Sequence, residues 1–328
     1  MFFSEYFQID SDLLHEYGAV DVSLICDMPL FIDPMLIFNS DNPEYTNLHE
    51  SIIRYFHFLA TKASCGLQNN EIRAWFKFSE VKNNWLGYSL VGNGGSALGD
   101  DYAKFLYDNI GFAISTNNIS QSVHIEKIML LYKGSGKDRI SDLTVNLIKQ
   151  YLLEYTQTFA VNYICPELRK SMYVDRAYFN YETESFVSKE YMLPYITNRK
   201  GKDEYVLLTP ADILREDEPS INRVDFYNSH GRIRASIDND VLRAYVNNYI
   251  FESVRKYEEQ QRRKKRPIRE RTISKIEKDA FAELAHEYPE LYDYYIRLRE
   301  SDTNEIRTKS ANEVHLQLEK FLVNTQEL

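Results

Sequence analysis

The chain has 328 residues, of which 44% are hydrophobic and 27% charged, a balance typical of a folded globular protein rather than a disordered one. Its formal net charge of −10 excludes a generic nucleic-acid coat protein, so any contact with nucleic acid needs a local basic patch. The length predicts one large domain accompanied by a smaller one.

Three cysteines, Cys26, Cys65 and Cys165, show no CxxC spacing and are odd in number, which favours free thiols in a reducing compartment. The first ten residues, MFFSEYFQID, lack the basic region and long apolar core of a signal peptide. No run approaches the roughly 20 apolar residues that a membrane span needs. We therefore expect a cytoplasmic protein with no membrane contact.

Residues 1–235 mix short apolar runs with helical patterns, which predicts an α/β (α+β) N-terminal domain. Residues 236–328 have helical patterning almost throughout, which predicts an all-helical C-terminal region suited to interaction with a partner. We place the boundary near Ser236, after the glycine turn at Gly231.

In the N-terminal domain, Asp10 is expected to cap a short helix that ends at Gly18, and Pro43 to open a second helix. The remaining segments are assigned from apolar spacing and turn residues. Further helices are predicted at 69–78, 100–114 and 141–163, and strands at 20–27, 30–32, 85–91, 176–186 and 205–209.

In the C-terminal region, apolar spacing predicts helices at 238–262, 272–286, 288–300 and 310–323. The segment 123–132 is ambiguous between a buried strand and a helix. Tyrosines between Tyr288 and Tyr295 would suit a protein interface, so a protein partner or a homo-oligomer is expected through this region.

The most informative segment is GSGKDRISD, residues 134–142, which leads into the strongest helix of the first half. On that helix Asp142, Asn146, Gln150, Glu154 and Gln157 share one face. Two interpretations stay open: the carboxylates occupy a solvated face, or Asp138 and Asp142 bind a divalent cation while Arg139 grips a phosphate.

The apolar segment CDMPLFIDP, which is expected to be extended, contains two aspartates, Asp27 and Asp33. They are either turn-capping residues or further metal ligands, because an unpaired carboxylate is costly to bury. If they meet Arg139 the site is a structural salt bridge, and if they meet Asp138 or Asp142 it is a metal site.

Two segments are candidates for phosphate contact. The loop carrying Gly92, Gly94 and Gly95 brings backbone amides close to a phosphate or is simply flexible, and it matches neither GxGxxG nor the P-loop pattern. A basic run precedes Pro267 and is either a nucleic-acid patch or a solvated helix junction. Its residues include Arg262, Arg263, Lys264 and Lys265.

Motifs of the chain carry a family resemblance. The chain resembles the N-terminal region of large uncharacterised bacterial proteins found among phage-defence and restriction genes. The motifs that carry the resemblance are GxGxDRISD at residues 134–142, FIDP at 31–34 and the glycine loop. The resemblance spans roughly residues 1–215. In fuller members a restriction-endonuclease-like domain follows this region, which implies that the nuclease is a separate chain or that this chain is a fragment or a shortened relative.

The resemblance implies a component of a bacterial antiviral defence system that acts on or senses DNA or RNA. In the enzyme version the chain is a DNA-binding hydrolase that cleaves phosphodiester bonds with the help of Mg²⁺. The ion is bound by Asp138, Asp142 and Glu154, together with Asp27 or Asp33. In the binding version, the same residues form a sensor or regulatory surface, or an interaction module that partners a nuclease. The acids lie on a helix rather than on the strand that a standard nuclease core uses.

Overall fold

The computed structural model describes residues 1–87, 99–115, 127, 130, 137–198, 200–216 and 221–302. It is an α+β structure with small antiparallel sheets and a helical C-terminal region, as the sequence predicted. The glycine loop at 92–95 and the predicted helix at 310–323 lie outside the described residues. Among the helices that the structure describes, none combines the length and apolarity that a membrane span requires.

The N-terminal domain is organised around α8 (Lys137–Tyr163), which begins a few residues before its predicted start. Strands β2 (Arg169–Asn180) and β3 (Ser185–Thr197) pair as an antiparallel hairpin against this helix, and β4 (Asp203–Tyr205) pairs with β3. A second small sheet joins β1 (Phe31–Ile32) to β5 (Leu214–Arg215) and also contacts α8.

Helix α4 (Pro43–Ala63) lies beside α8 and has the start that its sequence predicts. Asn42 caps it by accepting from the amide of Glu44 at 3.0 Å, and Pro43 occupies the first turn. Its positions at helical spacing are buried in the first core, as expected of an amphipathic helix. The other helices of the domain are α1 (Phe3–Phe7), α2 (Ser11–Glu16), α3 (Pro34–Phe38), α5 (Asn69–Phe76) and α6 (Asp100–Ser115).

The strand predictions at 20–27, 176–186 and 205–209 were wrong in whole or in part, and only Tyr205 of the last lies in a strand. Residues 20–27 are extended in part. Their backbone hydrogen bonds and bridges go to two different segments, the N-terminus and residues 209–210, so they do not pair with one partner strand. Of the predicted strand 85–91 only residues 85–87 are described, where Trp85 adopts a left-handed conformation with φ 54° and Leu86 makes an isolated bridge to Met28. The predicted strand 176–186 is not continuous: it contains the end of β2, the hairpin turn at 181–184 and the start of β3.

The second core holds the C-terminal helices, and it begins before the predicted boundary at Ser236. Ile221, Phe226 and Ile233 are buried with the long helices and not with the first core. The helices are α9 (Arg223–Asn228), α10 (His230–Ser236), α11 (Asp240–Arg263), α12 (Glu270–Glu287) and α13 (Glu290–Ser301). Helix α3 joins the two cores, since Met35 is buried in the second and Ile37 in the first.

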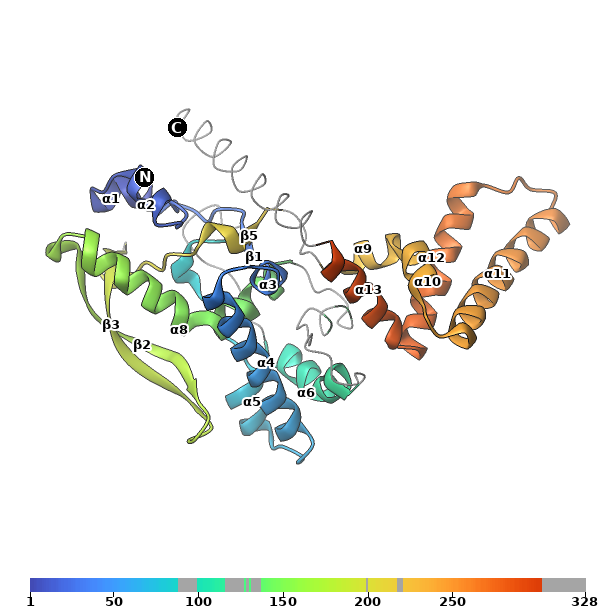
Figure 1. Cartoon of the computed structure of the whole chain (residues 1–328), viewed down its shortest axis with the longest axis horizontal. Helices are drawn as coiled ribbons and strands as arrows, with labels where there is room; N and C mark the ends of the chain where they lie inside the picture. The colour runs from blue at the N-terminus through green and yellow to red at the C-terminus, as the bar shows by residue number, and fades with distance from the viewer. Residues whose placement is uncertain are drawn as a thin grey trace.

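In the view of Figure 1, α11 and α12 form an antiparallel pair at the opposite end of the molecule from the β2–β3 hairpin. We call this helix pair the helical arm. At 24 residues, α11 is about 36 Å long, and the segment that connects it to α12 lies at the far end of the helical arm.

We predict that Gly18→Ala destabilises the protein by roughly 1 kcal/mol, because Gly18 has φ +84°, where a side chain is unfavourable. Urea denaturation measures the change. Gly231→Ala in α10 is the matched control: a Cβ there meets open space and the residue has no positive φ. Equal losses in the two variants would contradict the conformational explanation.

Candidate functional site

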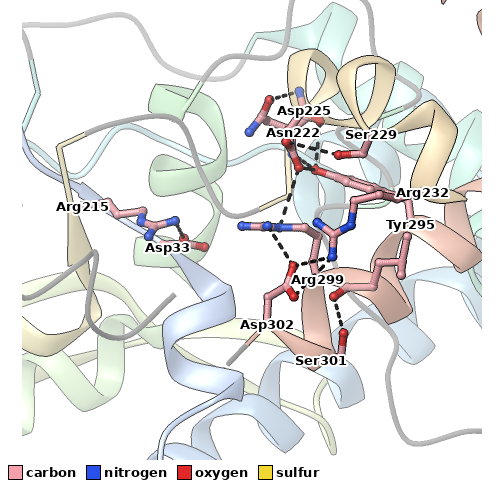
Figure 2. A network of polar contacts seen from close by, with 11 residues as sticks. Asp33, Arg215, Asn222, Asp225, Ser229, Arg232, Tyr295, Arg299, Ser301 and Asp302 are labelled. Carbon is pink, nitrogen blue, oxygen red and sulfur yellow. Dashed lines mark hydrogen bonds and ion pairs between the residues drawn. The ribbon is translucent and has the colours of Figure 1, made fainter. Parts of the chain in front are cut away.

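Asp33, a predicted metal ligand, serves the fold. Its carboxylate accepts from the amide of Met35 at 3.0 Å, which caps α3, and lies 3.5 Å from the guanidinium of Arg215 on β5. Both side chains are buried, at 1% and 2% exposure, and Figure 2 shows them pointing toward each other. The sequence left open a structural salt bridge at Asp33, and the structure shows a buried one with Arg215.

Beside this pair, a polar network joins α9, α10 and α13 (Figure 2). The carboxylate of Asp225 accepts from the hydroxyl of Tyr295 at 2.8 Å, and Arg299 lies 3.2 Å from Asp302. Arg232 approaches Asp302 at 3.3 Å. Arginines therefore neutralise the acids of this network, which stabilises the helical region and is not a candidate catalytic centre.

The predicted catalytic carboxylates on α8 do not form one site. Twelve residues separate Asp142 from Glu154, which places them about 18 Å apart along the helix axis. Ligand distances around a divalent cation are roughly 2.0–2.6 Å, so these two cannot share one ion. Asp142 and Arg139 are half-buried and each has an interaction partner, while the side chain of Asp138 is outside the described residues.

Asp27 lies beside Gly87, where an added Cβ would come within 3.2 Å of its carboxylate oxygen. Within the part of the chain that the structure describes, no group of three or more His, Cys, Asp or Glu side chains is arranged to hold a metal ion. The arrangement of the described carboxylates therefore lends no support to the predicted Mg²⁺ site.

The polar face of α8 is instead covered in part by neighbouring elements. The carboxamide of Asn146 donates to the carbonyl of Ser79 at 2.6 Å. The carboxamide oxygen of Gln157 accepts from the amide of Met192 on β3 at 2.8 Å. Between these contacts, Gln150 donates to Glu154 at 3.0 Å, and both side chains remain exposed. The middle of this face opens into a cleft.

The cleft has a volume of about 580 Å³ and lies between α4, α8 and the β2–β3 hairpin. We call it the aromatic cleft. Its rings include Tyr151, Tyr155, Tyr178, Phe179, Tyr181 and Phe186. Its polar groups include Glu44, Asn47, Ser51, Asn146, Gln150 and Glu154. No lysine, arginine or histidine is among the described residues that line it.

Negative charge in the aromatic cleft is not compensated. Among the described residues, no cation lies within ion-pair distance of Glu44 or Glu154, and both are exposed. Burial, with a smaller effect of the nearby Glu44 carboxylate, raises the pKa of Tyr17 and of Tyr151 to about 12. These hydroxyls therefore stay neutral hydrogen-bonding groups at physiological pH.

Sequence reasoning missed this cleft because it missed the hairpin turn that forms one wall. The usable signal was Asn180, whose side chain accepts from the amides of Glu182 and Thr183 at 2.8 and 3.2 Å. Such a turn needs neither glycine nor proline, the residues on which turn assignment mainly relies.

The second candidate surface is the segment 262–275 between α11 and α12, which we call the basic tip. It contains eight lysines or arginines and one glutamate, a local charge of +7 in an acidic chain. Every residue from Arg262 to Arg271 is exposed. In the described structure a single ion pair reaches this cluster, from Arg262 to Glu258 at 3.8 Å. The predicted basic patch is therefore accessible to solvent.

These features define an α+β protein with an aromatic, acidic cleft in one part and a basic helical arm in another. The chain belongs to the family described as a domain of unknown function, DUF8370, whose model matches residues 8–222. The match covers the FIDP and DRISD motifs and the aromatic cleft, and it ends where the second core begins. No curated protein and no solved structure matches the chain.

We predict that Asp33→Asn lowers the free energy of unfolding by about 3 kcal/mol, because Asn keeps the cap but removes the carboxylate charge from a buried ion pair. Chemical denaturation measures this change. Asp12→Asn, on the exposed first turn of α2, is the control, and its effect should stay within about 0.5 kcal/mol. A rise in Tm with Mg²⁺ that Asp33→Asn abolishes would contradict the structural role.

Proposed function

We propose that this chain is a nucleic-acid-binding component of a bacterial antiviral defence system, and that the basic tip makes the contact. The observation that carries the proposal is the concentration of positive charge at 262–275 in a chain of net charge −10. Phosphate contacts supply most of the affinity of non-specific nucleic-acid binding, and they require accessible lysine and arginine side chains.

The position of the basic tip supports this proposal. Two long helices carry it away from the acidic bulk of the protein, so its cations can approach a duplex or a single strand with little repulsion (Figure 1). Lys264 and Lys265 follow the last turn of α11, and Arg269 precedes the first turn of α12. The cations thus surround the tip rather than lining one helix.

The defence context is part of the proposal and rests on the resemblance of the GxGxDRISD and FIDP motifs. A cytoplasmic location is also proposed, since Cys26, Cys65 and Cys165 are free thiols, which suits a reducing compartment. We propose binding rather than cleavage because Asp142 and Glu154 are too far apart to act on one metal ion and Asp33 is paired with Arg215.

We predict that replacing Arg263, Lys264 and Lys265 with glutamine weakens binding to a short mixed-sequence DNA duplex and to single-stranded RNA of equal length. The slope of log K against log salt should fall by about one unit for each phosphate that the variant no longer neutralises, up to about three. Fluorescence anisotropy across a salt series measures both quantities.

The matched control replaces Lys189, Lys200 and Lys202 with glutamine, which removes the same charge from exposed positions in the N-terminal domain. Its affinity and salt slope should stay close to those of the unmodified protein. Equal losses for the two triple variants would mean that net charge alone governs binding, and the basic tip would lose its assigned role.

Cleavage is tested separately. We predict that plasmid DNA incubated with the protein and Mg²⁺ or Mn²⁺ stays intact across a range of protein concentrations, because the described carboxylates do not converge. Gel electrophoresis gives the result. Metal-dependent loss of DNA that Asp142→Ala abolishes would overturn the binding-only proposal and restore the enzyme version.

A further inference from the structure

The aromatic cleft combines three features that select a ligand: ring faces, carboxylates with no ion-pair partner among the described residues, and no cation among its described lining residues. Tyr151 and Tyr155 are one helical turn apart on α8, with ring centroids 6.0 Å apart and planes inclined by 27°. Glu154 lies on the same face, within three residues of Tyr151. An acceptor-only carboxylate therefore stands beside two roughly parallel rings.

The walls of the cleft already hold guanidinium groups of the chain itself. The guanidinium carbon of Arg54 lies 4.0 Å from the ring centroid of Tyr181, and that of Arg176 lies 3.7 Å from the ring of Phe186. Both rings line the cleft. Ring faces in this part of the molecule thus accept planar cations, and the rings of Tyr151 and Tyr155 have no described cation over them.

The charge of the cleft decides between ligand classes. A phosphate would face Glu44 and Glu154, no described lysine or arginine lines the cleft, and the guanidinium groups of Arg54 and Arg176 are already stacked on wall rings, so a phosphate is unfavourable. A neutral nucleobase could stack on the rings, but it would leave both carboxylates uncompensated. A guanidinium complements both the rings and the carboxylates, because its plane stacks on an aromatic face while its donors bind a carboxylate through two parallel hydrogen bonds.

We infer that the aromatic cleft binds the guanidinium group of an arginine side chain presented by a protein partner. The cleft is open and its two carboxylates are exposed, so an extended segment can pass across it with only one side chain inserted. The carboxamides of Asn47 and Gln150 line the same cleft and can bond the backbone of that segment. The basic tip lies at the other end of the molecule, so this site is independent of the nucleic-acid proposal (Figure 1).

The first test uses NMR chemical-shift titration of the full chain with four probes: Nα-acetyl-arginine amide, its citrulline and lysine analogues, and AMP. Citrulline has the shape of arginine without its charge. We expect saturable shifts in residues of the cleft with the arginine probe and at least about tenfold weaker binding of the other three. A peptide with one internal arginine should bind at least as well as the amide.

The second test removes the carboxylate charge without changing shape. Glu44→Gln combined with Glu154→Gln should weaken binding of the arginine probe about tenfold or more. Glu50→Gln, an exposed residue of α4 outside the cleft, should leave binding unchanged. Unchanged amide spectra away from the substitutions confirm that each variant is folded.

Several results would overturn the inference. Equal binding of arginine and citrulline, preferred binding of AMP, or full affinity in the double glutamine variant would each exclude guanidinium recognition. Equal binding of the lysine analogue would show a site for any cation. Concentration-dependent self-association that the double variant abolishes would assign the site to a second copy of this chain rather than to a separate partner.

Discussion

The buried ion pair between Asp33 and Arg215 is the interaction on which the arrangement of the two cores depends. Asp33 ends β1 and caps α3, whose residues enter both cores, and Arg215 lies on β5 just before the helical region. Replacing a buried ion pair with apolar residues is often neutral for stability, whereas breaking one is costly. The pair therefore fixes geometry at the junction more than it adds net stability.

The same junction gives the DRISD motif a structural role. The hydroxyl of Ser141 accepts from the amide of Ile32 at 3.0 Å, which attaches the start of α8 to β1. Ile140 and Leu143 are buried in the first core. FIDP and DRISD are thus joined by a structural contact, in which Ser141 binds the backbone of β1 and Asp33 pairs with Arg215.

Helix periodicity made much of the fold predictable. The start of α4 and the boundaries of α11 and α12 are close to those expected, because amphipathic spacing and caps are local properties of the sequence. The short strands were less predictable, since residues 20–27 bond to two distant segments. The charges of the basic tip are adjacent in the sequence and were visible there. The aromatic cleft was not predictable, because α4, α8 and the β2–β3 hairpin come together to form it only after folding.

The molecule keeps its two candidate surfaces apart: an acidic aromatic cleft in the family domain and a basic tip on the helical arm. The most direct measurement is hydrogen–deuterium exchange of the full chain with and without a short DNA duplex. Slower exchange confined to peptides covering residues 255–275 is predicted, with the aromatic cleft unchanged. Protection over α8 and the β2–β3 hairpin, with none at the basic tip, would contradict the proposed nucleic-acid surface.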